Sequence, residues 1–264
     1  MKDFEGIIKK IESAKALFVD WDGCIFQSHR VIPGAERFLR HYKQKTYILS
    51  NNSTDLPDAF TALLKPAGVS FPADRIVLAG HQAVLYAVAK HRRDRVFMLA
   101  NKAMRDFAKA QQLTLVGKNA DVVLLLRDLE FNYTKIRVAA NMVRSGARLI
   151  AANPDMTHPT DDGVVPETGA LLSSIQACLG DCDDDPTIIG KPSKLLFETA
   201  LERAKVAPED VVMLGDNPST DIEGATALGM QSVLIAPKAR VTLGSLIDFA
   251  QASRGSRLTI ATAE

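Results

Sequence analysis

The sequence has few cysteines, no excess of charge of either sign and no long apolar run. Its 264 residues include three cysteines, Cys24, Cys178 and Cys182. An odd and sparse set of cysteines does not form a disulfide framework, and it fits a reducing compartment. No second cluster of cysteine or histidine accompanies Cys178 and Cys182 to complete a zinc site. We therefore expect a cytoplasmic protein without structural zinc.

Charge and hydropathy argue against two further classes of protein. The 32 basic and 31 acidic side chains leave a net charge of +1, whereas nucleic-acid-binding domains usually carry a basic excess. No apolar run approaches the length of a membrane-spanning helix. Residues 1–15 contain acids and lack the apolar stretch of a signal peptide. We expect no nucleic-acid partner and no membrane partner.

Short apolar runs alternate with segments of helical periodicity. The predicted strands are 16–19, 47–49, 96–99, 122–126, 149–151, 211–214 and 232–235. The predicted helices are 35–42, 56–64, 83–90, 133–145, 170–179 and 194–204. Nearly continuous apolar strands separated by helices indicate a parallel sheet covered on both faces. The predicted fold class is α/β, a doubly wound parallel sheet with a second, smaller α/β unit at about 92–184.

Polar segments follow several of these strands. In a parallel sheet the working residues stand at the carboxyl ends of the strands. The segments that carry suitable side chains are 20–23, 50–53, 190–192 and 215–221. We expect them to meet at one edge of one sheet.

Four acids fall in these segments: Asp20, Asp22, Asp216 and Asp221. Crowded carboxylates are costly unless a cation neutralises them. Ligand sets made only of oxygen select Mg²⁺ over zinc. The pattern therefore predicts a Mg²⁺ site formed by these four acids, and a cleft of this kind suits a phosphate group.

The remaining needs of phosphate chemistry each have a candidate residue. Asp20 can act as the nucleophile, and Asp22 can act first as general acid and then as general base. Ser50 and Asn51 can donate hydrogen bonds to the phosphoryl oxygens, while Lys191 can balance the acids and hold the phosphate. These residues predict hydrolysis of phosphate monoesters through an aspartyl-phosphate on Asp20.

The four segments together resemble the motifs of the haloacid dehalogenase superfamily. Residues 18–23, 49–53, 189–192 and 215–222 resemble its motifs one to four, in the family's order. The D-x-D-G and G-K-P strings are weak signals singly, but all four motifs in order form a strong one. The resemblance implies a Mg²⁺-dependent phosphatase in which Asn52 joins Ser50 and Asn51 in substrate binding. It also implies that Trp21 offers its backbone carbonyl to the metal.

The long insert between motifs two and three resembles the type IIA cap of the p-nitrophenylphosphatase, pyridoxal phosphatase and phosphoglycolate phosphatase branch. Its signature loop reads Ala152-Asn153-Pro154-Asp155, followed by Pro166 and by Gly169-Ala170. Glu167 is a departure, because relatives usually have glycine at this position. The resemblance implies a catalytic core of residues 1–91 and 185–264, a cap of residues 92–184, and a homodimer formed through the cap.

The sequence leaves the substrate open. Two other function classes are weighed against a phosphatase: a dehalogenase or mutase, and a non-enzymatic binding protein. Within the loop 153–169, His158 before Pro159 resembles the pyridoxal phosphatase pattern and implies that His158 contacts the substrate. Pyridoxal phosphate is therefore one candidate, and phosphoglycolate, nucleotides and sugar phosphates are the alternatives. Dehalogenases lack the second acid that Asp22 supplies, and mutases typically carry a smaller cap. A non-enzymatic binding relative would have lost a catalytic residue, and none of the expected ones is missing.

Overall fold

The computed structural model describes residues 2–160, 163–180, 185–236 and 240–261. Cys182 and the predicted end of the cap at residue 184 lie outside these ranges. The chain forms two compact units, the first made of Met1–Leu49, Phe60–Ile76 and Phe197–Glu264, the second of Ser50–Ala59 and Val77–Leu196. The bounds of these units do not test the assignment of residues 92–184 to an inserted cap, which stays a prediction.

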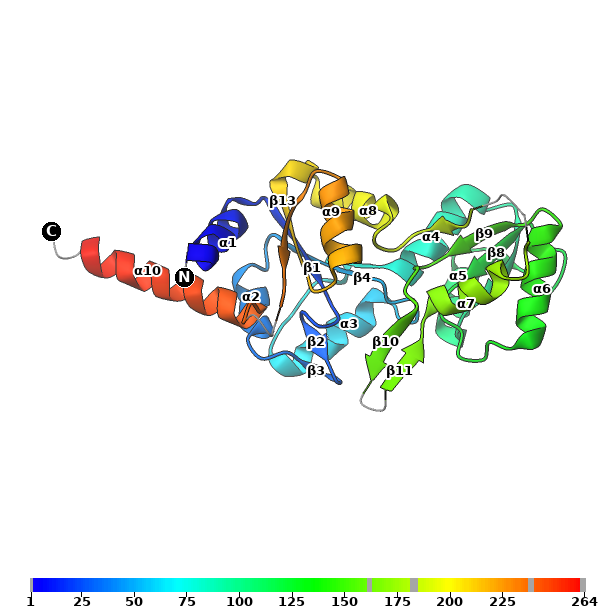
Figure 1. The fold of residues 1–264 in the computed structure, drawn as a ribbon, viewed down its shortest axis with the longest axis horizontal. Coiled ribbons are helices and arrows are strands. Elements are labelled where there is room, and N and C mark those ends of the chain that lie inside the picture. The colour runs from blue at the N-terminus through cyan, green and yellow to red at the C-terminus, as the bar shows by residue number, and fades with distance from the viewer. Residues whose placement is uncertain (1, 161–162, 181–184, 237–239, 262–264) are drawn as a thin grey trace. The chain divides into compact units, whose positions relative to one another are not determined.

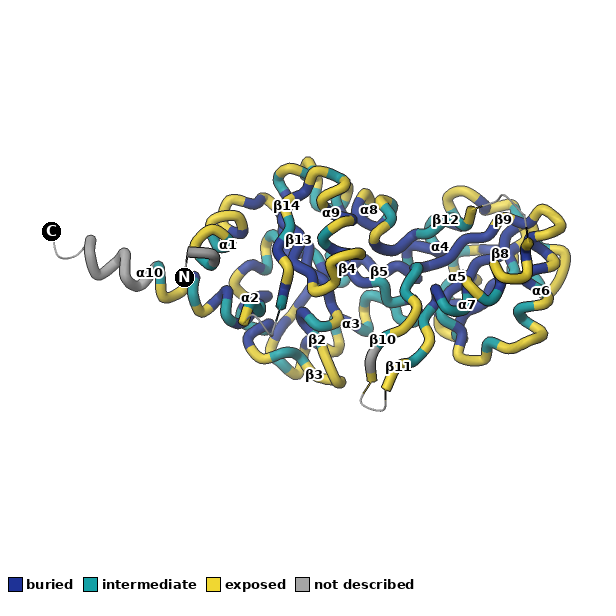
Figure 2. The backbone as a smooth tube through the Cα atoms, viewed as in Figure 1, coloured by how far each residue is buried: buried dark blue, intermediate teal, exposed yellow. Residues whose placement is uncertain are grey.

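The first unit is built on a five-stranded sheet with the order β14-β13-β1-β4-β5. Its strands are β1 (Ala16–Asp20), β4 (Thr46–Ser50), β5 (Ile76–Leu78), β13 (Val211–Gly215) and β14 (Gln231–Leu234). The central strand β1 is parallel to both of its neighbours, and every residue of β1 and β13 is buried (Figure 2). The chain leaves β1 toward β4 on one side and returns to β13 on the other. The carboxyl end of β1 is therefore a switch point of the sheet, where α/β proteins bind ligands.

Helices and a small hairpin complete the first unit (Figure 1). The elements outside the sheet are α1 (Lys2–Ser13), β2 (Phe26–Gln27), β3 (Arg30–Val31), α2 (Ala35–His41), α3 (Pro57–Leu64), α8 (Lys194–Ala204), α9 (Glu223–Ala227) and α10 (Leu243–Ala261), with short helices at Lys65–Ala67, Ala73–Arg75, Pro208–Asp210 and Pro218–Ile222. Helices α3 and α8 each continue into the second unit. The hairpin β2–β3 turns through Ser28 and His29, which both have positive φ. Two left-handed residues are what a two-residue hairpin turn requires.

The second unit has its own parallel sheet, with the order β12-β9-β8-β6-β7. Its strands are β6 (Arg95–Leu99), β7 (Thr114–Leu115), β8 (Val122–Leu125), β9 (Arg148–Ala151) and β12 (Thr187–Ile188). Its helices are α4 (Ala79–His91), α5 (Lys102–Ala110), α6 (Tyr133–Arg144) and α7 (Thr168–Gln176). Val122 and Leu124 pack with residues of α4 and α5, whereas Val123 and Leu125 pack with residues of α6 and α7. Alternate residues of a strand point to opposite faces, so helices cover both faces of this sheet.

These two sheets confirm the predicted α/β fold class. Each predicted strand and helix is present, with ends that differ by a few residues. The expectation of an irregular loop at 153–169 was wrong, because residues Thr157–Thr160 (β10) and Gly163–Pro166 (β11) form an antiparallel hairpin (Figure 1). The hairpin escaped prediction because β10 is polar and contains a proline. In the part of the chain that the structure describes, no helix combines the length and the apolar character needed to span a bilayer.

Candidate active site

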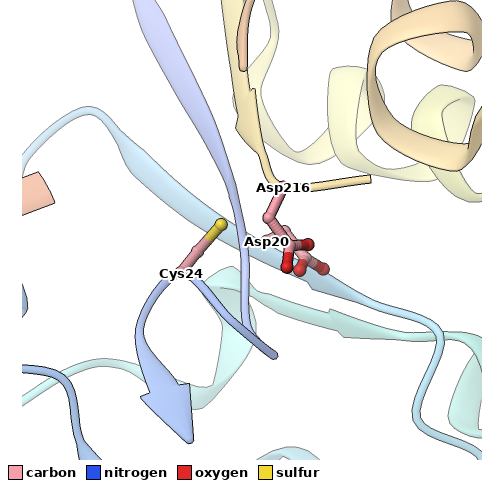
Figure 3. Close-up of side chains that lie close together, drawn as sticks. All are labelled: Asp20, Cys24 and Asp216. Atoms are coloured by element: carbon pink, nitrogen blue, oxygen red, sulfur yellow. The ribbon is translucent and has the colours of Figure 1, made fainter. Parts of the chain in front are cut away.

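Two predicted acids lie together at the carboxyl end of the first sheet. Asp20 ends β1, and Asp216 directly follows the neighbouring strand β13. Ligand atoms of Asp20, Asp216 and Cys24 all lie within 4.8 Å of one another (Figure 3). Among the described residues this is the one group of three or more such side chains. Asp20 and Cys24 are buried, whereas Asp216 is exposed.

Gly23 allows this close approach. It has φ of +72°, and a Cβ built on it would lie 2.1 Å from Oδ2 of Asp216. A side chain here would meet both a strained backbone and a carboxylate. The glycine of the D-x-D-G string therefore makes room for the acid that arrives from β13.

Asp22 and Trp21 occupy the turn that follows β1. The Trp21 carbonyl accepts hydrogen bonds from the N–H groups of Ile25 and Phe26, each at 2.9 Å. The Trp21 ring packs against the rings of Phe26 and Phe60, with centroids 5.1 and 4.4 Å away. Asp22 is exposed and lies outside the three-residue cluster. The ring of Trp21 thus holds the turn, and its carbonyl is engaged within the turn.

Asp221 shapes the loop that carries Asp216. Its Oδ2 accepts a hydrogen bond from the N–H of Asn217 at 3.1 Å. A Cβ added to Gly215 would lie 2.2 Å from the same oxygen, so the glycine before Asp216 leaves space for the Asp221 carboxylate. Asp221 is buried and, like Asp22, does not belong to the three-residue cluster.

Asn51 joins two of the predicted motifs within the second unit. Its Oδ1 accepts a hydrogen bond from the Lys191 N–H at 2.8 Å, and its Nδ2 donates to the Lys191 carbonyl at 2.9 Å. A Cβ on Gly190 would lie 2.5 Å from Oδ1 of Asn51. The glycine of the G-K-P string therefore permits this two-way contact, which ties the backbone of Lys191 to motif two.

The expected meeting of this segment with the segments 20–23 and 215–221 stays a prediction. Lys191 follows β12, and β12 pairs with β9 of the second sheet. The segment 190–192 thus leaves a strand of the second sheet, yet it contacts Asn51, which directly follows β4 of the first sheet. Periodicity cannot reveal this, because it reports that a strand is buried and not which sheet it joins.

Ser50 and Asn52 lie on either side of Asn51. Ser50 is buried and follows Leu49, the residue that pairs with Asp20 in the register of β1 and β4. Its Oγ accepts a hydrogen bond from the Asn52 N–H at 3.0 Å. The Asn52 side chain in turn accepts from the N–H of Thr54 at 3.0 Å. Asn52 therefore has a turn-forming role in addition to the predicted contact with substrate.

The signature loop contributes residues for which the sequence predicted no role. Asn153 donates from Nδ2 to the Asn51 carbonyl at 2.6 Å, and Asp155 accepts from Nδ2 of Asn51 at 3.0 Å. A Cβ on Gly169 would lie 2.1 Å from the Pro154 carbonyl oxygen. The loop thus holds the second motif directly. The resemblance marked these positions, but their partners became visible only in the structure.

Arg127, His158 and Glu167 form a polar cluster near the base of the hairpin. Glu167 Oε1 accepts from Nη1 of Arg127 at 2.8 Å and lies 2.6 Å from Nδ1 of His158. Glu167 has φ of −109°, in the extended region. The glycine of relatives is therefore not needed here for backbone freedom. His158 was a candidate on sequence grounds, while Arg127 and Glu167 were not recognised as its partners.

The donor set at the end of β1 fits a hard divalent cation. Carboxylate oxygens such as those of Asp20 and Asp216 are the ligands that Mg²⁺ takes from proteins. The sulfur of Cys24 is a ligand of softer metals and does not belong to a Mg²⁺ set. A buried carboxylate beside a cation is also well placed to act as a nucleophile toward phosphorus.

Comparison with known proteins identifies the family. A model of haloacid dehalogenase-like hydrolases matches residues 17–114, and a second model, of HAD-hydrolase-like proteins, matches residues 188–237. The 5'-nucleotidase YutF of Bacillus subtilis is 30% identical over 232 residues, which cover 85% of this chain and 88% of that protein. The chain belongs to the haloacid dehalogenase-like hydrolases. The dihydroxyacetone phosphatase of Corynebacterium glutamicum is 28% identical over 82% of this chain and 78% of its own length.

Solved structures place this hydrolase in the predicted branch. The p-nitrophenyl phosphatase from Archaeoglobus fulgidus superimposes with a TM-score of 0.78 at 25% identity, covering 84% of this chain and 86% of that one. A glycerol phosphate phosphatase from Mycobacterium tuberculosis in complex with magnesium gives a TM-score of 0.75 at 26% identity, covering 84% and 68%. The resemblance to the p-nitrophenylphosphatase branch is confirmed, and the protein is a phosphoric monoester hydrolase.

Proposed function

We propose that this protein hydrolyses small phosphate monoesters with the help of Mg²⁺, using Asp20 as a covalent nucleophile. The observation that carries this is the approach of the Asp20 and Asp216 ligand atoms, within 4.8 Å, at the switch point of the sheet. Two carboxylates so close favour a bound cation. The mycobacterial relative has been solved in complex with magnesium and in complex with calcium, which supports a hard divalent cation.

In the proposed reaction an oxygen of Asp20 attacks phosphorus, and the ester P–O bond breaks. Asp22 gives its proton to the departing alcohol oxygen. Asp22, now ionised, takes a proton from water while that water attacks the phosphorus of the aspartyl-phosphate. The P–O bond to Asp20 then breaks, which releases inorganic phosphate and restores the Asp20 carboxylate.

The other predicted residues bind and balance charge. Mg²⁺, when bound, would stabilise negative charge on the phosphoryl group. Asp20 and Asp216 are the residues that we propose as its protein ligands, with Asp22 and Asp221 as the further ligands predicted from the sequence. We propose that Lys191, Ser50, Asn51 and Asn52 bind the phosphate. A cytoplasmic location and a homodimer through the cap also stay predictions.

Two substrate classes are proposed. His158 carries the first, pyridoxal phosphate, because an imidazole can stack on or hydrogen-bond to an aromatic leaving group. The second is the phosphate ester of a small polyol or sugar, and the names of the relatives from C. glutamicum and M. tuberculosis favour it. Phosphoglycolate and nucleotides complete the set to be compared.

The test replaces Asp20 and compares it with a matched surface acid. Asp20→Asn should abolish turnover of p-nitrophenyl phosphate, because the uncatalysed reaction is slow enough that enzymes accelerate it by up to about 10²¹-fold. Asp58→Asn, an exposed acid in the first turn of α3, should leave turnover unchanged. Each protein is assayed with and without Mg²⁺, and circular dichroism verifies its fold. Retention by Asp20→Asn of as much as about a tenth of wild-type turnover would refute the covalent route.

A further inference from the structure

In the cluster of Arg127, His158 and Glu167, one oxygen has two hydrogen-bonding neighbours, whereas one buried nitrogen has none among the described residues. One carboxylate oxygen, Oε1 of Glu167, serves both Nη1 of Arg127 and Nδ1 of His158, and these two nitrogens lie 3.5 Å apart. The Nε of Arg127 is buried and has no hydrogen-bond partner among the described residues. A buried donor without a partner is costly and calls for a functional explanation. The Nε is closed to solvent here, so a ligand oxygen can accept from it only after the guanidinium turns toward the ligand.

The cluster is attached to the proposed phosphate-binding loop within the same compact unit. The backbone N–H of Arg127 donates to Oγ of Ser53 at 3.1 Å, and that Oγ lies 3.0 Å from Oγ1 of Thr168. Thr168 directly follows Glu167, and Ser53 is the last residue of the motif that contains Asn51. Both members of the Arg127–Glu167 pair are therefore held next to the segment proposed to bind phosphate.

The charges of the pair suit an uncharged leaving group. A guanidinium and a carboxylate at 2.8 Å neutralise each other, and the two side chains are only 23% and 14% exposed, which limits screening by water. A hydroxyl group can accept from the guanidinium and donate to the carboxylate at once. A ligand carboxylate would be attracted by Arg127 but repelled by Glu167.

We propose that Glu167 acts as a charge filter for the leaving group, selecting hydroxylated, uncharged alcohols over those that bear a carboxylate or a second phosphate. Arg127 supplies the donor, and Glu167 prevents Arg127 from serving as a site for a second anion. This inference rests on the proposed function and narrows its substrate class to phosphates of neutral polyols.

The test uses two phosphate esters that differ only in the group that Glu167 is proposed to discriminate. Glycerol 3-phosphate carries a CH₂OH where 3-phosphoglycerate carries a carboxylate, and inorganic phosphate lacks the leaving group altogether. Affinities for all three are measured calorimetrically in the Asp20→Asn variant with Mg²⁺, so that the esters are not consumed. This parent variant should bind glycerol 3-phosphate more tightly than 3-phosphoglycerate.

Glu167→Gln, made in the same background, should shift the ratio of the two affinities toward 3-phosphoglycerate by about tenfold or more, the size of one charged interaction. Glutamine keeps the size of the side chain and an oxygen for Arg127. Glu130→Gln is the matched control, since Glu130 is an exposed acid of the same unit, with 81% of its side chain exposed. Glu130→Gln should leave the ratio unchanged, and neither substitution should alter the affinity for inorganic phosphate.

Arg127→Gln provides a second, independent measurement. Arg127→Gln should lower the affinity for glycerol 3-phosphate and leave the affinity for inorganic phosphate unchanged. Combined with Glu167→Gln, it should cancel the increase in relative affinity for 3-phosphoglycerate that Glu167→Gln produces alone. A ratio in Glu167→Gln that stays within about threefold of the parent overturns the inference, as does an equal shift in Glu130→Gln or a failure of the parent to bind either ester. Turnover of p-nitrophenyl phosphate by the wild type is scored separately. A wild type that does not hydrolyse p-nitrophenyl phosphate would refute the proposed function, without bearing on the affinity ratio.

Discussion

Asp221 folds back onto Asn217, so that its carboxylate accepts the Asn217 N–H at 3.1 Å while its own N–H donates to the Asn217 carbonyl at 3.0 Å. This closed turn sets the direction in which the chain leaves β13, and therefore the position of Asp216. The Asp221 carboxylate therefore stabilises the turn that follows β13, and this structural role is separate from the proposed contact with metal.

The turn makes Asp221 a residue whose loss should reduce stability. Asp221→Ala leaves the Asn217 N–H without its charged acceptor, which should cost about 1–3 kcal/mol of unfolding free energy. Urea denaturation measures this cost. Ser219→Ala, an exposed neighbour whose side chain has no described partner, should have little effect. A wild-type midpoint for Asp221→Ala would show that the turn does not depend on the carboxylate.

Asp216 should control the dependence on metal. Asp216→Asn removes an anionic ligand from the pair with Asp20, so the Mg²⁺ concentration for half-maximal activity should rise at least about tenfold. The concentration is read from a titration of p-nitrophenyl phosphate turnover. Asp58→Asn, the surface control used above, should titrate like the wild type. An unchanged Mg²⁺ curve for Asp216→Asn would remove this residue from the ligand set.

The effect of replacing Asp22 should depend on the leaving group of the substrate. Asp22→Asn removes the proposed proton donor, worth roughly 10²–10⁴ in rate. The loss should be larger for alkyl phosphates, whose alkoxides need a proton, than for p-nitrophenyl phosphate, whose phenolate leaves unaided. Comparison of kcat for glycerol 3-phosphate and p-nitrophenyl phosphate decides this. Equal losses for both substrates would argue that Asp22 acts in some way other than as an acid.

Gly23 should tolerate no side chain. Gly23→Ala would place a methyl group 2.1 Å from Oδ2 of Asp216 at a φ of +72°. Displacement of the carboxylate should raise the Mg²⁺ requirement, and the strained backbone should cost about 1 kcal/mol or more of stability. Gly146→Ala separates the two effects, since Gly146 also has positive φ but has no atom within 4 Å of an added Cβ. Only Gly23→Ala should change the metal curve.

One ion pair should give the protein a measurable response to acid. Nε and Nη2 of Arg95 donate to Asp121 at 3.0 and 2.8 Å, and the Arg95 backbone N–H donates to it as well. These hydrogen bonds hold the pKa of Asp121 well below its usual range. Because the folded pKa is depressed, the pair contributes its full stability above about pH 4, near the value in the unfolded chain, and loses it as the pH falls further.

Carboxyl NMR titration measures this pKa directly. In the wild type Asp121 should remain ionised after exposed carboxyl groups of the chain have taken up protons. Arg95→Gln should bring the midpoint back toward the ordinary value for aspartate, and Arg137→Gln, at an exposed position on α6, should not. Equal midpoints in wild type and Arg95→Gln would show that the pair does not persist in solution.

The local elements of this protein were readable from its sequence for a simple reason. The run from Ala16 to Val19 is apolar enough to be a buried strand wherever it pairs, and Asp20-Trp21-Asp22-Gly23 marks where that strand must end. Strand and helix signals depend on neighbours in the chain, which the sequence displays directly. The four motifs are equally local, so their order and the family that they resemble were also visible.

Contacts between distant segments needed the tertiary structure. Asp216 reaches Asp20 because β13 pairs with β1, and Lys191 follows a strand that joins the other sheet. The hydrophobic periodicity predicts neither pairing, because all buried parallel strands have the same apolar pattern. The partnership of Arg127 with Glu167 likewise joins residues 40 positions apart. Motifs thus identified the chemistry from the sequence alone, whereas the neighbours of each acid and base were decided by how the strands pair and how the loops between them close.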